Sequence, residues 1–265
     1  MKKVLSIAGS DCSGGAGIQA DIKTIAAHQM YAMTVITVLT AQNTTGVYGI
    51  AEVASEFVAK QMDCVFSDIF PDAVKIGMVY NAEIIRTIAA KLKQYQAQNI
   101  ILDPVMVATS GGNLLSADSI ESLKTELMPL ADLITPNIPE AEYLCGFAIQ
   151  TKSDMVRAAK KMAENYQGSI LIKGGHRLDS ADDFLLIHKD QSSQERWFPG
   201  AKIANPNSHG TGCTLSSAIA CGLAAGAEIE QAVRNAKDYV SGALSANLDL
   251  GKGSGPLDHG YKMKQ

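Results

Sequence analysis

The sequence has no long hydrophobic run, and this argues against a protein that spans a membrane. No apolar stretch approaches the roughly 20 consecutive residues that a membrane-spanning helix requires. The apolar run at residues 4–8 is interrupted by Ser6 and followed by Gly9, so it is also too short for the core of a signal peptide. We therefore expect neither a membrane partner nor an export signal.

Paired cysteines and basic runs are also missing. The cysteines are odd in number and scattered, without a C-x-x-C pair; they are Cys12, Cys64, Cys145, Cys213 and Cys221. This pattern argues against a disulfide framework and against a structural zinc site, and it fits a reducing cytoplasm. The net charge is −4 and no long basic stretch occurs, which argues against nucleic acid as a partner.

The chain does have enough hydrophobic residues, 46% of 265, to bury a sizeable core. Strand patterns lie at 4–8, 34–40, 47–53, 73–76, 100–102, 133–135, 169–173, 184–188 and 195–198. Helix patterns lie at 18–28, 55–66, 81–95, 116–127, 155–166, 214–225 and 229–248, with Ser55 and Ser116 as N-caps. The alternation indicates an α/β fold, with a mainly parallel sheet covered on both faces and a late antiparallel pair. Because no linker, repeat or low-complexity tract interrupts the pattern, we expect a single domain over residues 1–265.

Two glycine-rich loops lead directly into helices. The first, residues 9–17, follows a strand, and the second, residues 205–212, contains Pro206, Gly210 and Gly212. A loop that turns into a helix N-terminus points free amide groups at one place and binds anions, phosphate above all. Cys213 lies at that point, where the pKa of a thiol tends to fall. The alternative is a simple helix cap with Cys213 as a small buried hydrophobic residue.

Several polar residues follow the expected strands. Asp103 could hold a metal, or it could only form a turn; Asn137 and Glu140 could face Mg²⁺, or they could form a capping box. Lys173 could reach a phosphate, or it could be one exposed lysine among many. His209 has no evident carboxylate partner in the sequence, which argues against a catalytic base. Together these residues and the second glycine loop indicate phosphoryl transfer, in which positioning and charge neutralisation supply most of the catalysis.

These motifs resemble those of the bacterial hydroxymethylpyrimidine/phosphomethylpyrimidine kinases of thiamin synthesis, members of the ribokinase-like superfamily. The resemblance covers nearly the whole chain. The matching stretches are Ile7-Ala8-Gly9-Ser10-Asp11, residues 13–21, Ala41-Gln42-Asn43-Thr44, Lys75-Ile76-Gly77-Met78, Leu102-Asp103-Pro104-Val105-Met106, residues 135–141, Lys173-Gly174-Gly175-His176 and His209-Gly210-Thr211-Gly212-Cys213-Thr214.

The resemblance implies a three-layer α/β/α fold, ATP with Mg²⁺, and a homodimer. It also implies two successive phosphorylations of 4-amino-5-hydroxymethyl-2-methylpyrimidine. Its pocket residues would be Gly9, Asp11, Asp21, Gln42, Met78 and Val105, although Asp11 and Asp21 read in isolation as ordinary solvated acids. Asp103 and Glu140 would serve the metal, and Asn137, Glu140, Lys173, Thr211 and Gly212 would serve the nucleotide and its phosphates. Gly210, Thr211 and Gly212 would form an anion hole with Cys213, which takes the place of the aspartate base of the sugar kinases. Cys213 would either accept the hydroxymethyl proton as a thiolate or only position the hydroxymethyl group.

Two other functions stay open. One is a pyridoxal kinase of the same superfamily, and the other is a pyrimidine-binding regulator without turnover. Gln42 separates the two kinase hypotheses, because a side-chain amide can pair with the ring nitrogen and amino group of an aminopyrimidine, and pyridoxal has no such amino group. Against the regulator stands the complete set of phosphate-site residues.

Overall fold

The structure is a computed structural model that describes residues 1–106, 116–175, 181–189 and 192–264. The glycines at 111 and 112, which mark a loop in the sequence, and the motif residue His176 lie outside the described residues.

In the part of the chain that the structure describes, one nine-stranded sheet runs through the molecule, in the order β3-β2-β1-β4-β5-β6-β7-β8-β9. The strands are β1 (Lys3–Asp11), β2 (Tyr31–Asn43), β3 (Gly46–Glu52), β4 (Ala73–Ile76), β5 (Ile100–Leu102), β6 (Leu133–Ile134), β7 (Ser169–Ile172), β8 (Asp183–Lys189) and β9 (Ser192–Phe198). In that order, the six strands from β2 to β7 pair in parallel, whereas β3, β8 and β9 pair antiparallel. This confirms the mainly parallel sheet and the late antiparallel pair.

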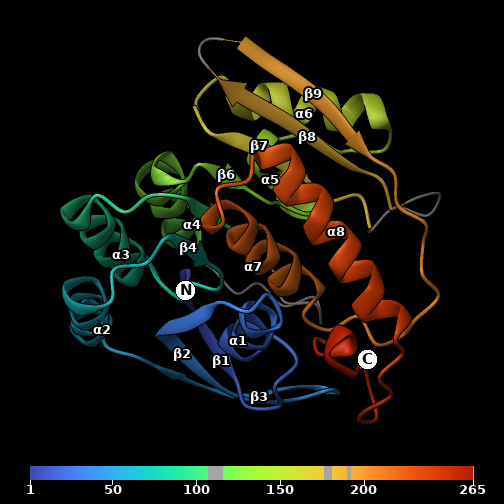
Figure 1. The fold of residues 1–265 in the computed structure, drawn as a ribbon. Coiled ribbons are helices and arrows are strands. Elements are labelled where there is room, and N and C mark those ends of the chain that lie inside the picture. The colour runs from blue at the N-terminus through green and yellow to red at the C-terminus, as the bar shows by residue number, and fades with distance from the viewer. Residues whose placement is uncertain (107–115, 176–180, 190–191, 265) are drawn as a thin grey trace.

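Helices cover both faces of the sheet (Figure 1). They are α1 (Gly17–Ala27), α2 (Ser55–Asp68), α3 (Ala82–Tyr95), α4 (Ala117–Ser122), α5 (Ile138–Cys145), α6 (Lys152–Ala163), α7 (Thr211–Ala224) and α8 (Ile229–Ser245). Three short segments add to them: π-helical η1 (Leu123–Leu127) and the 3-10 turns η2 (Met128–Leu130) and η3 (Tyr261–Lys264).

Alternation along the strands divides the core into two apolar layers. In β1, Leu5 and Ile7 belong to the layer under α2 to α6, whereas Val4 belongs to the layer under α1, α7 and α8. Residues Ile170 and Leu171 of β7 divide in the same way. Successive side chains of a strand point to opposite faces, so a parallel strand buried on both faces consists of a continuous apolar run. The three-layer α/β/α architecture is therefore confirmed.

The N-caps predicted from the sequence are confirmed at one of two helices. Ser116 caps α4 by accepting a hydrogen bond from the amide of Ser119, and helix α3 has the same kind of cap at Asn81. The prediction for Ser55 was wrong, because Ala54 is the N-cap of α2 and makes no side-chain cap bond. The Ser55 hydroxyl instead donates to Glu83 at 2.6 Å, so a contact between helices replaces the local one.

The parallel strands bring the polar loops of the sequence to one edge of the sheet. Strand β1 ends at Asp11, β5 is followed by Asp103, and β7 is followed by Lys173. Because all three strands are parallel, their carboxyl ends meet at the same edge, where ligands bind in open α/β sheets.

Candidate active site

The two glycine-rich loops lie directly against each other at this edge. Gly210 has a φ of +84° and is the N-cap of α7, and a Cβ added there would overlap the carbonyl oxygen of Gly15 in the first loop. In the opposite direction, a Cβ on Gly15 would overlap the ring of His209. Both positions therefore require glycine, one for its backbone conformation and both for the close approach. The contact joins the start of α1 to the start of α7.

The N-terminus of α7 presents free backbone amides. The amide of Thr211 donates to the carbonyl of Ser208, and that of Thr214 donates to Gly210. Within the described residues the amides of Gly212 and Cys213, which lie between them, have no hydrogen-bond acceptor. Free amides at the positive end of a helix dipole bind an anion, so the cradle predicted from the sequence has the required geometry.

An acid and a lysine lie beside this cradle. Lys173 Nζ is 2.7 Å from Oδ1 of Asp103, and Thr135 donates to the same oxygen at 3.1 Å. A Cβ on Gly212 would stand 3.2 Å from Asp103 Oδ2 and 3.3 Å from Lys173 Nζ. Burial alone would lower the pKa of Lys173, but Asp103 and then Glu140 raise it above its usual range. Lys173 is thus a largely covered, charged partner of the site, with 15% of its side chain exposed, and not one exposed lysine among many.

Asn137 and Glu140 form the capping box of α5. The Asn137 side chain accepts from the Glu140 amide at 2.9 Å, and Glu140 Oε2 accepts from the Asn137 amide at 2.8 Å. The capping box, which was the alternative to a magnesium site, is therefore confirmed. The Glu140 carboxyl also interacts with other charges. Burial raises its pKa to about 7, the charge of Lys173 opposes this rise, and the charge of Asp103 adds to it. The carboxyl of Glu140 consequently belongs to the same electrostatic cluster as the anion cradle.

The predicted activation of Cys213 by the helix N-terminus is wrong for the protein without ligand. Burial raises the pKa of the thiol; Lys75 opposes this rise, and the carboxylates of Asp21 and Asp103 add to it. The Gly17 amide also favours the thiolate, but too weakly to reverse the direction. Cys213 therefore rests as a neutral thiol at the start of α7.

Asp21 does not line an open pocket. It is fully buried, and Lys75, also fully buried, approaches its two oxygens at 2.9 and 2.8 Å. Ser6 and Ser217 complete the shell at 2.5 and 2.8 Å. Burial would lower the pKa of Lys75, but Asp21 first of all holds it above its usual range. Asp21 is thus the counter-charge of a lysine in the middle of the sheet and not a solvated acid.

Sequence reasoning gave Lys75 no role, although a signal was present. Lys75 lies in β4, whose four residues are all buried. A lysine inside such a short apolar strand needs a buried acid, since an unpaired charge is rarely tolerated there. The partner itself could not be named from the sequence, because Asp21 lies 54 positions earlier.

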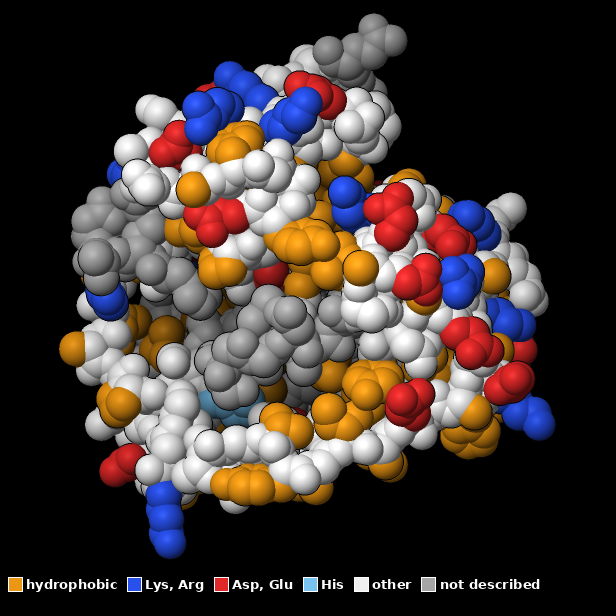
Figure 2. All heavy atoms as spheres, turned by 180° about the vertical axis from the view of Figure 1, so that it is seen from behind, with side chains coloured by type: hydrophobic (Ala, Val, Ile, Leu, Met, Phe, Trp, Pro, Cys, Tyr) orange, Lys and Arg blue, Asp and Glu red, His pale blue; other side chains and the backbone are white. Residues whose placement is uncertain are grey.

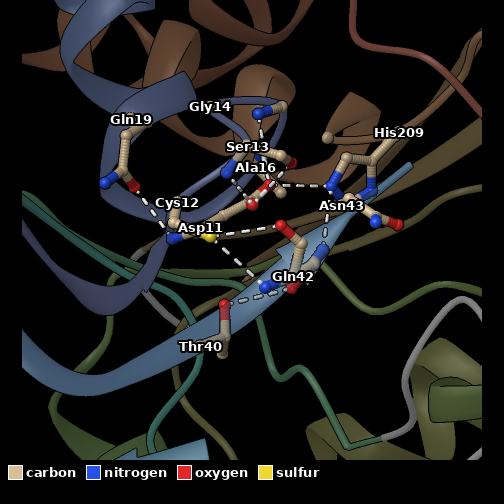
Figure 3. Close-up of polar contacts among 12 residues, drawn as sticks. Asp11, Cys12, Ser13, Gly14, Ala16, Gln19, Thr40, Gln42, Asn43 and His209 are labelled. Carbon is tan, nitrogen blue, oxygen red and sulfur yellow. Dashed lines mark hydrogen bonds and ion pairs between the residues drawn. The ribbon is translucent and has the colours of Figure 1, made fainter. Parts of the chain in front are cut away.

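His209 has the carboxylate partner that the sequence did not reveal. Its Nε2 lies 2.9 Å from Oδ2 of Asp11 and 3.1 Å from the amide nitrogen of Gln42 (Figure 3). Asp11 is buried, and burial would raise its pKa, but hydrogen bonds from His209, Ser13 and loop amides hold the pKa well below the usual range. Asp11 is therefore an ionised acid inside the first glycine loop, not a solvated one.

The remaining pocket candidates fall into one small group and one separate residue. Gly9 and Met78 are neighbours, because a Cβ on Gly9 would lie 3.5 Å from the sulfur of Met78. Val105 lies two residues after Asp103 and is partly exposed. The face of the molecule in Figure 2 is hollowed above the edge at which Figure 1 draws β3, and hydrophobic side chains gather along that edge.

Neither a conventional metal cluster nor a membrane segment occurs in the part of the chain that the structure describes. No group of three or more His, Cys, Asp or Glu side chains is arranged to hold a metal ion there. None of its helices combines the length and apolar character needed to cross a membrane.

A three-layer fold with an anion cradle, a largely covered lysine and an acid at the carboxyl edge of its sheet defines a ribokinase-like kinase. The comparison with family models makes this specific, because the model for phosphomethylpyrimidine kinase matches residues 11–258. The chain belongs to that family.

Relatives and solved structures agree with this assignment. The hydroxymethylpyrimidine/phosphomethylpyrimidine kinase of Rhizobium meliloti is 46% identical over 97% of both chains. The thiamine biosynthesis bifunctional protein of Geobacter sulfurreducens is 48% identical over 97% of this chain, which spans only 52% of that relative. Phosphomethylpyrimidine kinase of Clostridium difficile has a TM-score of 0.81 at 44% identity, covering 91% of this chain and 98% of that one. Bacillus subtilis pyridoxal kinase, solved with ADP, reaches 0.90 at 33% identity over the whole of both chains.

Proposed function

We propose that this chain transfers the terminal phosphoryl group of ATP to 4-amino-5-hydroxymethyl-2-methylpyrimidine and then to the monophosphate it has formed. The observation that carries this proposal is the convergence at Gly212, where two free amides, Asp103 and Lys173 meet at the start of α7. Phosphoryl transfer requires this combination, because its transition state is stabilised mainly by positioned positive charge and hydrogen-bond donors.

Each group at the cradle has a distinct part in this scheme. The start of α7 binds the transferring phosphate through the free amides of Gly212 and Cys213, and Lys173 neutralises the charge of the phosphate. Cys213, as a neutral thiol, positions the hydroxymethyl oxygen of the substrate. Because the transition state is loose, little help from a base is needed, and the proton of the hydroxyl can pass to an oxygen of the transferred phosphoryl group late in the reaction, as ADP leaves.

Magnesium fits the donor set that the site offers. Mg²⁺ in phosphoryl-transfer sites typically binds one or two carboxylates, with waters and phosphate oxygens completing its shell. Asp103 Oδ2 faces Gly212, and Glu140 belongs to the same cluster of charges, so these two carboxyl groups would hold the ion with Asn137 beside them. When bound, the ion would neutralise charge on the phosphates of ATP.

The pyrimidine would lie between β1, β2 and the loop after β4. Gln42 would read its amino group and ring nitrogen, with Asp11, Gly9 and Met78 beside it and Val105 on the opposite side. A pyridoxal kinase is the second candidate, because pyridoxal kinases are among the similar structures. Gln42 favours the pyrimidine, since pyridoxal offers no amino group to its amide.

We also propose a homodimer of single-domain chains. Strand β3 is an edge of the sheet, and the β2–β3 ribbon exposes Leu39, Val47, Tyr48 and Ile50. An exposed apolar edge strand is commonly protected by pairing or cover, and a second ribbon of the same kind would supply it. All five cysteines are free thiols, which supports a reducing compartment such as the cytoplasm.

The decisive experiment measures ADP release and product mass with Mg-ATP and four acceptors: the pyrimidine, its monophosphate, pyridoxal and ribose. We expect turnover of the first two. Turnover of pyridoxal alone would support the second candidate, and binding of the pyrimidine without ADP release would support a regulator. Lys173→Met should abolish turnover, whereas the matched variant at exposed Lys161 should not.

A further inference from the structure

His209 faces two different groups with a single ring nitrogen (Figure 3). Nε2 is 2.9 Å from Asp11 Oδ2 and 3.1 Å from Nε2 of Gln42. The imidazole is held in place, since it packs on the backbone of Gly15 and the His209 amide donates to the carbonyl of Gly255. None of these three side chains is part of the phosphate site, so we infer that they have a role other than binding phosphate.

Counting hydrogens determines how the three side chains bond. A carboxylate can only accept, so the hydrogen on His209 Nε2 points toward Asp11. The amide nitrogen of Gln42 also carries hydrogens, and two donors would then face each other across 3.1 Å. Turning the amide by 180° exchanges its oxygen and nitrogen without moving the rest of the side chain. The amide oxygen then accepts from the same Nε2–H.

Thr40, on the other side of Gln42, supports the same orientation. Its hydroxyl lies 2.9 Å from the carbonyl oxygen of Ser10 and 3.2 Å from the near end of the Gln42 amide. The hydroxyl has one hydrogen, and the carbonyl can only accept it. Thr40 therefore offers Gln42 a lone pair, which an amide nitrogen satisfies and an amide oxygen does not.

We propose that Asp11 and His209 form a positioning pair that fixes the Gln42 amide with its oxygen toward His209 and its nitrogen toward Thr40. This inference rests on the proposed function, in which Gln42 faces the pyrimidine. The amide has one lone pair and one N–H left, and both point away from its two neighbours. It therefore accepts from the exocyclic amino group and donates to the adjacent ring nitrogen.

The fixed amide also sets the direction of the substrate. The amino group lies on the His209 side, from which the chain continues through Gly210 into α7. The hydroxymethyl group is attached to the ring carbon next to the one that carries the amino group. The same orientation thus turns the hydroxymethyl group toward the anion cradle, and it disfavours a 4-oxo analogue, whose ring N–H and carbonyl present the inverse pattern.

The test compares His209→Leu with His209→Gln, because a glutamine amide can supply a hydrogen near the position of Nε2 and leucine cannot. Ser208→Ala is the matched control in the same loop, since Ser208 is exposed and, within the described residues, forms hydrogen bonds only through its backbone amide and carbonyl. For each variant kcat and KM are measured with the aminopyrimidine and its 4-oxo analogue, and melting temperature is recorded. In His209→Leu we expect KM for the aminopyrimidine to rise about tenfold and the preference over the oxo analogue to fall by a similar factor.

Under the proposal kcat of His209→Leu stays within about threefold of wild type, and His209→Gln recovers most of the lost preference. A fall in kcat at unchanged KM, or a preference that is equal in wild type and His209→Leu, would overturn it. So would a failure of His209→Gln to do better than His209→Leu when both are folded. If the wild-type chain does not phosphorylate the aminopyrimidine at all, the proposed function fails as well; if it does and only the variants disagree, the positioning pair alone is wrong.

Discussion

Replacing Asp21 by asparagine tests whether this acid stabilises the fold or binds the substrate. The change keeps the shape of the side chain and removes its charge, so Lys75 is left fully buried without a counter-charge. Breaking a buried ion pair by removing one partner costs about 3–5 kcal/mol. For a domain of this size about 1 kcal/mol corresponds to roughly 2–4 °C, so the melting temperature should fall by about 6–20 °C.

Two controls make the measurement specific. Lys161→Met breaks the exposed pair with Glu164 and should change stability by less than about 1 kcal/mol. Adding Lys75→Met to Asp21→Asn removes the stranded charge and should recover most of the loss, because replacing a whole buried pair by apolar groups is often close to neutral. Calorimetry or circular dichroism supplies the melting temperatures, and KM for the pyrimidine is measured on the folded protein.

We expect KM of the Asp21→Asn protein to stay within about threefold of wild type. A melting temperature equal to that of wild type, combined with a tenfold rise in KM, would refute the reasoning. Asp21 would then contact the substrate, as its motif implies, and the buried pair with Lys75 would contribute little.

Three further predictions follow from the same network of contacts. Cys213→Ser should keep kcat within about tenfold of wild type, since a hydroxyl replaces one neutral hydrogen-bonding group by another, and kcat should not rise steeply between pH 7 and 9. Burial lowers the pKa of His259 to about 4 from 6.5, so the unfolded chain binds a proton that the folded chain does not. Urea unfolding should therefore show stability decreasing by about 3 kcal/mol as the pH falls from 6.5 to 4, and His259→Gln should remove this loss. Asn137→Ala should cost about 1 kcal/mol of stability, the usual cost of a cap, whereas Glu140→Gln should mainly raise the Mg²⁺ concentration needed for half-maximal turnover.

Structural features that depend on local sequence patterns could be predicted from the sequence. The range predicted for β4 agrees with the structure at both ends, and the predicted caps at Ser116 and Asn137 lie at helix starts where short polar side chains meet free amides. The convergence of Asp103 and Lys173 also followed, because parallel strands place their carboxyl ends at one edge. The cap predicted at Ser55 was wrong because the Ser55 hydroxyl donates to Glu83, a partner from another helix.

The environment of the acids could not be predicted in this way. Asp11 and Asp21 look alike in the sequence, each next to a glycine-rich loop, yet the partner of Asp11 is His209 and that of Asp21 is Lys75. Both partners come from segments far along the chain, and no spacing within the chain identifies them. The role of His209 was hidden for the same reason.

Cys213 shows why a rule based only on the helix N-terminus can predict a pKa shift in the wrong direction. The start of a helix favours a nearby negative charge by about 0.3–1 kcal/mol, whereas moving a charge out of water costs several kcal/mol. Two buried carboxylates, Asp21 and Asp103, add to that cost, and Lys75 is already paired with Asp21. Because the cost of burying the charge exceeds the gain from the helix dipole, the thiol stays neutral. A neutral thiol leaves the amides of Gly212 and Cys213 free for phosphate, whereas a thiolate would compete with phosphate for the same positive end of the helix. The conditions that make the cradle a good phosphate site therefore also argue against a resting thiolate within it.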